Sequence, residues 1–129
     1  MAKEIMFRGK TIEELKELDT REFAKLVKSR TRRAILRQTA DIDNFVAKCV
    51  HNSSKNKLIK TQTRELVVVP KMIGYKIGIY SGKIYAPTEL TIEMLGHRLG
   101  EFCATRNKVK HGTAGIGATK SSMAKGTKK

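Results

Sequence analysis

Apolar residues recur every three to four positions through the first fifty residues of the chain, a spacing typical of amphipathic helices. The pattern predicts a short helix after Thr11, which begins with a capping box because Glu14 stands three residues further on. A second helix is predicted after Thr20, which can cap it, a third over residues 29–37, and a fourth over residues 42–50, where a polar stretch follows. The N-terminal region is therefore predicted to be helical.

The pattern becomes strand-like further along the chain. The β-branched run 66–69 and the alternation over residues 75–80 predict two strands, and residues 84–86 predict a third. Ser81 and Gly82 lie between the last two, so a hairpin with a two-residue loop is expected, in which Gly82 supplies the positive φ. The three strands are predicted to pair as an antiparallel sheet.

A last amphipathic helix is predicted over residues 92–102, with Thr91 as its N-cap. Gly96 and Gly100 lie four residues apart on one face of it, which indicates a close approach of another backbone segment. Beyond Thr105 no apolar period continues, so the sequence predicts a tail that does not fold alone. The predicted class is α+β, in three parts: a helical N-terminal region (1–56), an α+β core (57–105) with one packed amphipathic helix, and an extended basic C-terminal tail (106–129).

Composition limits the chain to one domain. Only seven of its 129 residues are aromatic and none is Trp, so there is little apolar surface for a second core. No stretch approaches the roughly 20 apolar residues of a membrane span, and the N-terminus lacks the apolar region of a secretory signal, so an intracellular protein is predicted. Cys49 and Cys103 have no metal-binding spacing and are predicted to be reduced, buried thiols.

The charge is large and unevenly placed. The formal net charge is +15, yet residues 1–27 and residues 65–102 each hold equal numbers of basic and acidic side chains. Residues 28–64 hold ten basic and two acidic side chains, and residues 103–129 hold seven basic residues and no acidic one. Such clustering selects a polyanionic partner, with nucleic acid as the leading candidate and an anionic membrane as the second.

The basic residues form three clusters: one on the predicted arginine helix, one in the link to the sheet, and one that opens the tail. Any single charged run is as readily explained as a solvated surface, but three clusters with almost no interleaved acid favour RNA binding. Sequence-specific DNA reading is less supported, because few Asn or Gln side chains accompany the arginines and no helix-turn-helix or zinc spacing is present.

A glycine-rich stretch near the C-terminus invites a phosphate-loop interpretation, which fails on inspection. The motif needs Gly directly before Lys120, where Thr119 stands, and no strand precedes it. The spacing of Gly112 and Gly115 matches the clamp loop of KH domains only as a short string.

For catalysis the only candidate is the series Glu93, His97 and Glu101 on the predicted last helix. Spacing by four is also the commonest arrangement of surface ion pairs on a helix, and no nucleophile or oxyanion donor accompanies it. We therefore predict that the protein is not an enzyme, with no catalytic residue, no metal and no cofactor.

Three tyrosines, Tyr75, Tyr80 and Tyr85, accompany the predicted hairpin. They are placed either to stack RNA bases on one face of the sheet or to pack within it. Packing is favoured on sequence alone, and the alternative stays open.

Several separated motifs occur in a fixed order in the second half of the chain. They are Val69-Pro70-Lys71-Met72-Ile73-Gly74, Ser81-Gly82-Lys83, Leu95-Gly96-His97-Arg98-Leu99-Gly100-Glu101-Phe102, Lys110-His111-Gly112 and Gly115-Ile116-Gly117-Ala118-Thr119-Lys120-Ser121-Ser122. In this order and spacing they resemble the nineteenth family of small-subunit ribosomal proteins. The long helical N-terminus and the tail motif are similar to its archaeal and eukaryotic cytosolic branch.

The resemblance implies an α+β core that is a structural constituent of the small-subunit head in the cytoplasmic ribosome. It implies binding to small-subunit ribosomal RNA, a neighbouring head protein of the thirteenth family, no homo-oligomer, and a tail that reaches toward the decoding region and transfer RNA. A free-standing RNA- or DNA-binding regulator outside the ribosome is the alternative that composition alone allows.

The predicted RNA contacts come from two sources. Motif position gives Lys60, Arg64, Lys71, Lys83, Arg98, Arg106, Lys108 and Lys110. Charge gives Arg30, Arg32, Arg33, Arg37, Lys57, His111 and Lys120.

Overall fold

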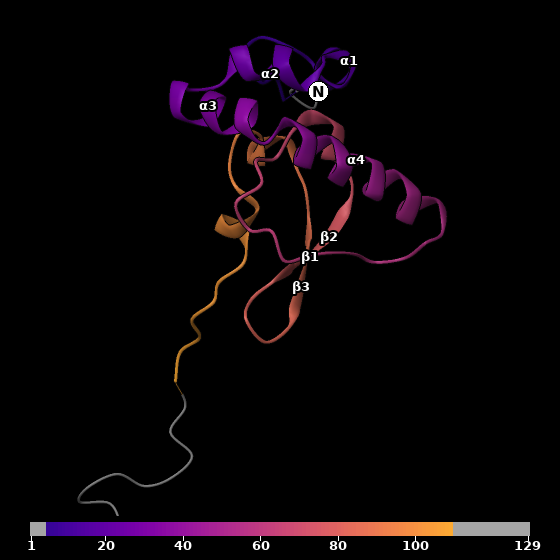
Figure 1. The fold of residues 1–129 in the computed structure, drawn as a ribbon, viewed down its shortest axis with the longest axis vertical. Coiled ribbons are helices and arrows are strands. Elements are labelled where there is room, and N and C mark those ends of the chain that lie inside the picture. The colour runs from indigo at the N-terminus through magenta and orange to yellow at the C-terminus, as the bar shows by residue number, and fades with distance from the viewer. Residues whose placement is uncertain (1–4, 110–129) are drawn as a thin grey trace, which may run out of the picture.

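Four helices lie together at one end of the molecule, and a small sheet extends away from them (Figure 1). This computed structural model describes residues 5–109. The helices are α1 (Ile12–Glu17), α2 (Thr20–Leu26), α3 (Ser29–Arg37) and α4 (Thr39–Ser54); the strands are β1 (Ile59–Thr61), β2 (Lys76–Tyr80) and β3 (Tyr85–Glu89); and the 3-10 turns are η1 (Pro70–Met72), η2 (Ile92–Met94) and η3 (Leu99–Phe102). The predicted α+β class is confirmed.

The starts of α1 and α2 follow from local hydrogen bonds. The capping box predicted for α1 is present, since the Thr11 amide donates to Glu14 Oε2 at 3.1 Å. The cap of α2 is Asp19 and not, as predicted, Thr20. Thr20 lies inside the helix, where its hydroxyl donates to Asp43 Oδ1 of α4 at 2.8 Å and so ties the two helices together.

Helix α4 runs further than its apolar pattern predicts, because polar side chains prolong the last turn and do not end it. The Ser54 hydroxyl donates to the carbonyl of His51 at 2.8 Å. The helix ends at Ser54, and two residues later Asn56 has a φ of 51°, a position that suits Asn because it tolerates the left-handed region.

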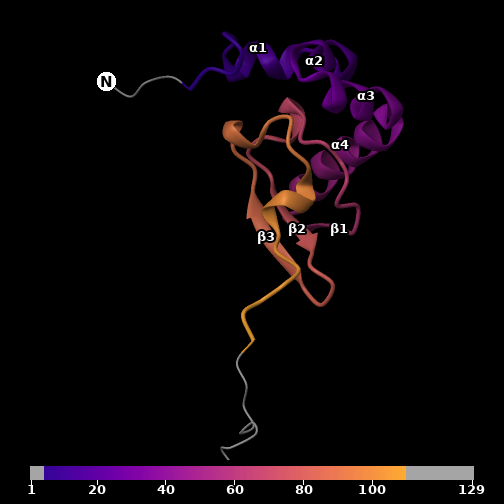
Figure 2. The ribbon, with the colours of Figure 1, turned by 90° about the vertical axis from the view of Figure 1, so that its left-hand side faces the viewer.

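The sheet has the order β1-β2-β3 and is mixed (Figure 2). Strands β2 and β3 form the predicted antiparallel hairpin, although its loop spans residues 81–84 and is longer than the two residues expected. Gly82 has the expected positive φ of 99°. Strand β1 pairs with β2 in parallel, so the prediction of an all-antiparallel sheet is wrong at this edge.

The β-branched run 66–69 is not a strand of the sheet. Its residues are buried on all sides, and its backbone pairs irregularly with the segment around Gly96. The Val68 amide donates to the His97 carbonyl at 2.8 Å, and the Gly96 amide donates to the Val68 carbonyl at 3.1 Å. The run is therefore an extended core segment between β1 and β2.

The predicted helix over residues 92–102 is replaced by the two turns η2 and η3. Gly96 has a φ of +77°, which no α-helix accommodates, so the helix cannot continue through it. Gly100 confirms the expected close approach, since a Cβ there would lie 3.0 Å from the Arg64 carbonyl oxygen.

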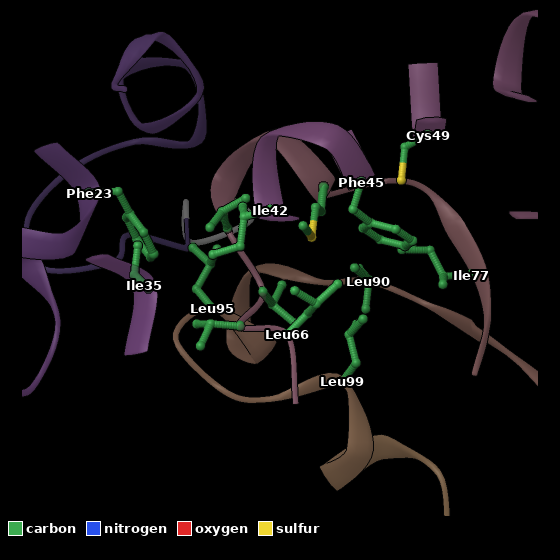
Figure 3. Packing of buried hydrophobic residues seen from close by; sticks show 14 of the residues in the cluster. Phe23, Ile35, Ile42, Phe45, Cys49, Leu66, Ile77, Leu90, Leu95 and Leu99 are labelled. Carbon is green, nitrogen blue, oxygen red and sulfur yellow. The ribbon is translucent and has the colours of Figure 1, made fainter. Parts of the chain in front are cut away.

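A single cluster of buried apolar side chains joins the helices to the sheet (Figure 3). Phe23 and Ile35 contribute to it from the helices, and Leu66, Ile77 and Leu99 from the region of the sheet. Cys49 and Cys103 are buried and unpaired, as predicted. Within residues 5–109 no helix has the length and apolarity to cross a membrane.

Candidate nucleic-acid interface

Helix α3 carries the predicted arginine cluster on its solvent side. Ile35 is its one fully buried side chain, and this orients Arg30, Arg33 and Arg37 outward, where all three are exposed. In the part of the chain that the structure describes, none of the three has a carboxylate within 4.0 Å. These three guanidinium groups are therefore available to an external anion.

Arg32 differs from its neighbours on α3, because its guanidinium is engaged within the protein. Its Nε donates to the Ala24 carbonyl at 3.0 Å, and its Nη2 donates to the Lys25 carbonyl at 3.1 Å and the Val27 carbonyl at 3.4 Å. These are carbonyls at the C-terminus of α2, where a helix carries partial negative charge. Arg32 thus caps α2, and its predicted RNA contact stays a prediction.

The second predicted cluster spreads over β1 and its flanks. Lys57 is exposed just before the strand, and Lys60 is exposed within it. The Lys60 Nζ lies 5.4 Å from the ring centroid of Tyr85, a cation–π distance.

Arg64, assigned to the same cluster, is half-buried and points inward. Its Nη1 donates to the Tyr80 carbonyl at 2.6 Å, and its Nη2 donates to the carbonyls of Gly100 at 2.8 Å and Cys103 at 2.6 Å. The side chain therefore joins the end of the hairpin to the point where the chain leaves η3. As with Arg32, an RNA contact of Arg64 remains a prediction.

Three further predicted contacts lie apart from one another. Lys71 in η1 is 3.9 Å from Asp19 Oδ1, a weak ion pair. Lys83 is exposed in the hairpin loop. Arg98 is exposed, and its backbone bridges to Val67.

The third cluster is only partly described. Arg106 and Lys108 are exposed beyond η3. Lys110, His111 and Lys120, together with the expected tail after residue 109, lie outside the described residues.

The structure does not bring the predicted cations into one patch. Helix α3 lies at one end of the molecule, whereas the hairpin loop and the segment after η3 lie at the other (Figure 1). Described cations thus occupy both ends, with the apolar core between them.

A groove of about 680 Å³, which the sequence did not predict, lies between α4 and β1. Lys48 and Asn44 line it from α4, and Lys60, Gln62 and Tyr85 line it from the sheet. The Lys48 Nζ donates to the Lys60 carbonyl at 3.3 Å. The available signal was the polar stripe Asp41, Asn44 and Lys48 at helical spacing beside the apolar face of α4.

The candidate catalytic series forms only a pair in the structure. His97 Nδ1 lies 2.8 Å from Glu101 Oε2, and both side chains are about half exposed.

Of the two thiols, Cys103 is buried with its Sγ 3.6 Å from the Ile79 carbonyl. Burial raises the pKa of Cys49 from its ordinary value near 9 to about 11, against an opposing effect of the Lys48 charge, so this group is a thiol at neutral pH. Among residues 5–109 no three His, Cys, Asp or Glu side chains converge as a metal site.

Comparison with known proteins supports the resemblance seen in the motifs. The sequence profile of the family described as Ribosomal protein S19 matches residues 33–111, more than half of the chain. A curated protein named "Small ribosomal subunit protein uS19", from Methanococcoides burtonii, is 40% identical over 119 residues, which cover 92% of this chain and 85% of the relative. The chain therefore belongs to the S19 family of small-subunit ribosomal proteins.

Proposed function

We propose that this protein neutralises phosphates of small-subunit ribosomal RNA and holds that RNA in shape, without catalytic turnover. Membership of a structural ribosomal family supplies the setting. The observation that carries the proposal is the unneutralised cationic surface. Over residues 5–109 the carboxylate pairs are Lys71 with Asp19 and His97 with Glu101, so phosphate oxygens are the counter-charges that the exposed arginines and lysines need.

The proposal places the protein in the head of the small subunit, within the ribosome. A head protein of the thirteenth family is the proposed neighbour, and the proposed position of the C-terminal tail is toward the decoding region and transfer RNA. Support for these finer points is the order of the family motifs, including Lys110-His111-Gly112 in the tail.

The salt dependence of RNA affinity tests the proposal directly. With about eight phosphate contacts, the logarithm of affinity for a head fragment of ribosomal RNA should fall against the logarithm of salt concentration with a slope of about −6 to −7. A salt-independent affinity contradicts phosphate binding.

Sedimentation of the protein in cell extracts tests its place in the particle. Co-migration with small subunits is the expected result. If the bulk of the protein stays in light fractions, the ribosomal proposal is wrong and a free-standing RNA- or DNA-binding regulator replaces it.

A further inference from the structure

One face of the sheet points away from the core. Because side chains alternate along a strand, Ile77 and Ile79 of β2 point to the core, and Gly78 and Tyr80 lie on the opposite face. Register places Tyr85 opposite Tyr80 and Lys60 beside Gly78 on that same face. Strand β3 has no buried residue and Lys60 is exposed, so this outer face is accessible at β3 and β1, whereas Gly78 in the central strand is buried under neighbouring side chains.

The tyrosines divide between core and outer face. Tyr75 packs against the buried cluster, whereas Tyr80 and Tyr85 are not part of that packing. Their two rings pair with each other at a centroid distance of 5.1 Å and an interplanar angle of 46°. Packing against the core therefore accounts for the position of Tyr75 but not for the Tyr80–Tyr85 pair.

Hydrogen bonds within the protein hold both rings in place. The Tyr80 hydroxyl donates to the Gly82 carbonyl at 2.8 Å, and the Gln62 amide donates to Tyr85 Oη at 3.1 Å. Gly78 adds to this, because a Cβ there would lie 3.3 Å from Tyr85 Cβ, tighter than ordinary contact. With the hydroxyls engaged, the pair offers its aromatic faces to a ligand.

Cations and amides lie around the half-buried Tyr85 ring. The Lys60 ammonium lies over Tyr85, and Lys48 lies next to it in the groove between α4 and β1. The amide side chains of Asn44 and Gln62 line the same groove, and Asp41 is the one carboxylate among the described residues that line it. Its volume of about 680 Å³ falls within the range of small-ligand clefts.

We propose that Tyr80 and Tyr85 form a stacking platform for an unpaired RNA base, with Lys60 and Lys48 binding the flanking phosphates. The base takes the face of Tyr85 that Lys60 covers, and the Lys60 ammonium moves onto a phosphate. Aromatic faces beside mobile cations are how proteins bind unpaired nucleotides, and the excess of lysine over carboxylate favours RNA over a protein partner. This inference rests on the proposed RNA binding and adds the kind of nucleotide and its site.

The first test measures the affinity of the full chain for a single-stranded uridine decamer, a probe with little structure of its own. Tyr85→Leu should weaken binding by roughly 5- to 100-fold, the effect of removing one stacking ring, with the salt slope unchanged. Tyr85→Phe keeps the ring and should lose far less. Lys60→Ala should instead lower the slope by about 0.7, the value for one phosphate contact on a single strand.

A second measurement does not depend on the folding of a variant at position 85. The chain has three tyrosines and no Trp, so its intrinsic emission reports on tyrosine alone. The decamer should quench this emission in the wild-type chain and equally in Tyr75→Phe, which leaves only the Tyr80–Tyr85 pair to be quenched.

The outcomes separate this inference from the proposed function. If the chain binds a ribosomal RNA duplex with a steep salt slope, but the decamer neither quenches emission nor distinguishes Tyr85→Leu from wild type, the platform is wrong and phosphate binding stands. If Tyr85→Leu leaves decamer affinity unchanged and only weakens association with other small-subunit proteins, the face is a protein contact and the platform is again wrong. If neither RNA binds, both proposals fail.

Discussion

Adjacent arginines on α3 have different roles. Arg32 donates to three carbonyls at the end of α2, whereas Arg33 is exposed with no carboxylate within 4.0 Å in the described part of the chain. Sequence alone cannot separate them, because both belong to one basic run and the C-terminus of α2 becomes a partner only when α2 and α3 pack.

This difference gives a matched pair of substitutions. Arg32→Gln should lower the free energy of unfolding by about 1–3 kcal/mol, because charged hydrogen bonds to the carbonyls at the end of α2 are lost. Arg33→Gln should change stability by less than about 0.5 kcal/mol and reduce the salt slope of RNA binding by about 0.7–0.9. Urea unfolding and salt titration measure the two effects; equal behaviour of the two variants would contradict the assignment.

The buried thiol of Cys49 predicts a loss of stability at high pH. An unfolded cysteine loses its proton near pH 9, whereas folded Cys49 keeps its proton up to a pKa of about 11. Between these values the unfolded chain binds fewer protons, so stability falls as pH rises, by roughly 2–3 kcal/mol in total, and is unaffected by this group below the unfolded pKa.

Unfolding by urea from pH 8 to pH 11 measures this loss. Cys49→Ala is the control. It should be less stable at pH 8 but show a shallower decline, because it lacks this thiol and shares every other side chain with the wild type. Parallel profiles would show that Cys49 does not contribute.

At the scale of elements, the four N-terminal helices and the pairing of the hairpin strands were predictable because their signals are local. Capping, helical period and the glycine turn each lie within a few residues. Strand β1 has three residues and pairs in parallel with a strand well beyond it in sequence, so no local pattern identifies it. The run 66–69 has strand composition because it is buried on all sides, which composition cannot distinguish from pairing within a sheet.

Gly96 accounts for the failure of the predicted last helix and provides a test of that explanation. Its φ of +77° strains any residue with a Cβ, so Gly96→Ala should lower the free energy of unfolding by about 1–2 kcal/mol. Gly96→Asn should cost less, because Asn tolerates the left-handed region. Among residues 5–109 only Val27 Cγ1, at 3.4 Å, would meet the new Cβ, so these residues crowd it little. Thermal unfolding ranks the variants, and an Ala variant as stable as wild type would show that the turn is not held at this φ.

The whole molecule carries a formal charge of +15, and the repulsion between its positive charges opposes folding. Raising NaCl from about 20 to 300 mM should therefore raise the melting temperature of the isolated protein, since the Debye length shortens to below 10 Å. Sulfate at equal ionic strength should raise it further, because a multivalent anion can also bind arginine. A melting temperature independent of salt would mean that the clusters are too far apart to repel one another.

The basic residues show how much of the candidate interface could be predicted from the sequence. Counting charges along the chain located the basic clusters, and the family motifs indicated a ribosomal protein. Neither showed that Arg32 and Arg64 donate to backbone carbonyls. Those bonds join segments that meet only in the fold, as Arg64 does with Tyr80 and Cys103. The groove lined by Lys48 could not be predicted for the same reason, because it forms only when α4 and β1 pack together.

The Arg64 side chain fixes the geometry from which the C-terminal segment departs. By bonding to Tyr80 and to Cys103 at once, it sets the exit of that segment against the hairpin loop, and a hollow of about 470 Å³ lies between Lys83 on one side and Asn107 on the other. The hairpin loop with Lys83 and the segment after η3 with Arg106 and Lys108 are thus held in a fixed relation by the protein itself. Under the proposed RNA binding, such preorganisation lowers the entropic cost of binding, so Arg64 is expected to contribute to affinity by holding the neighbouring cationic segments in position.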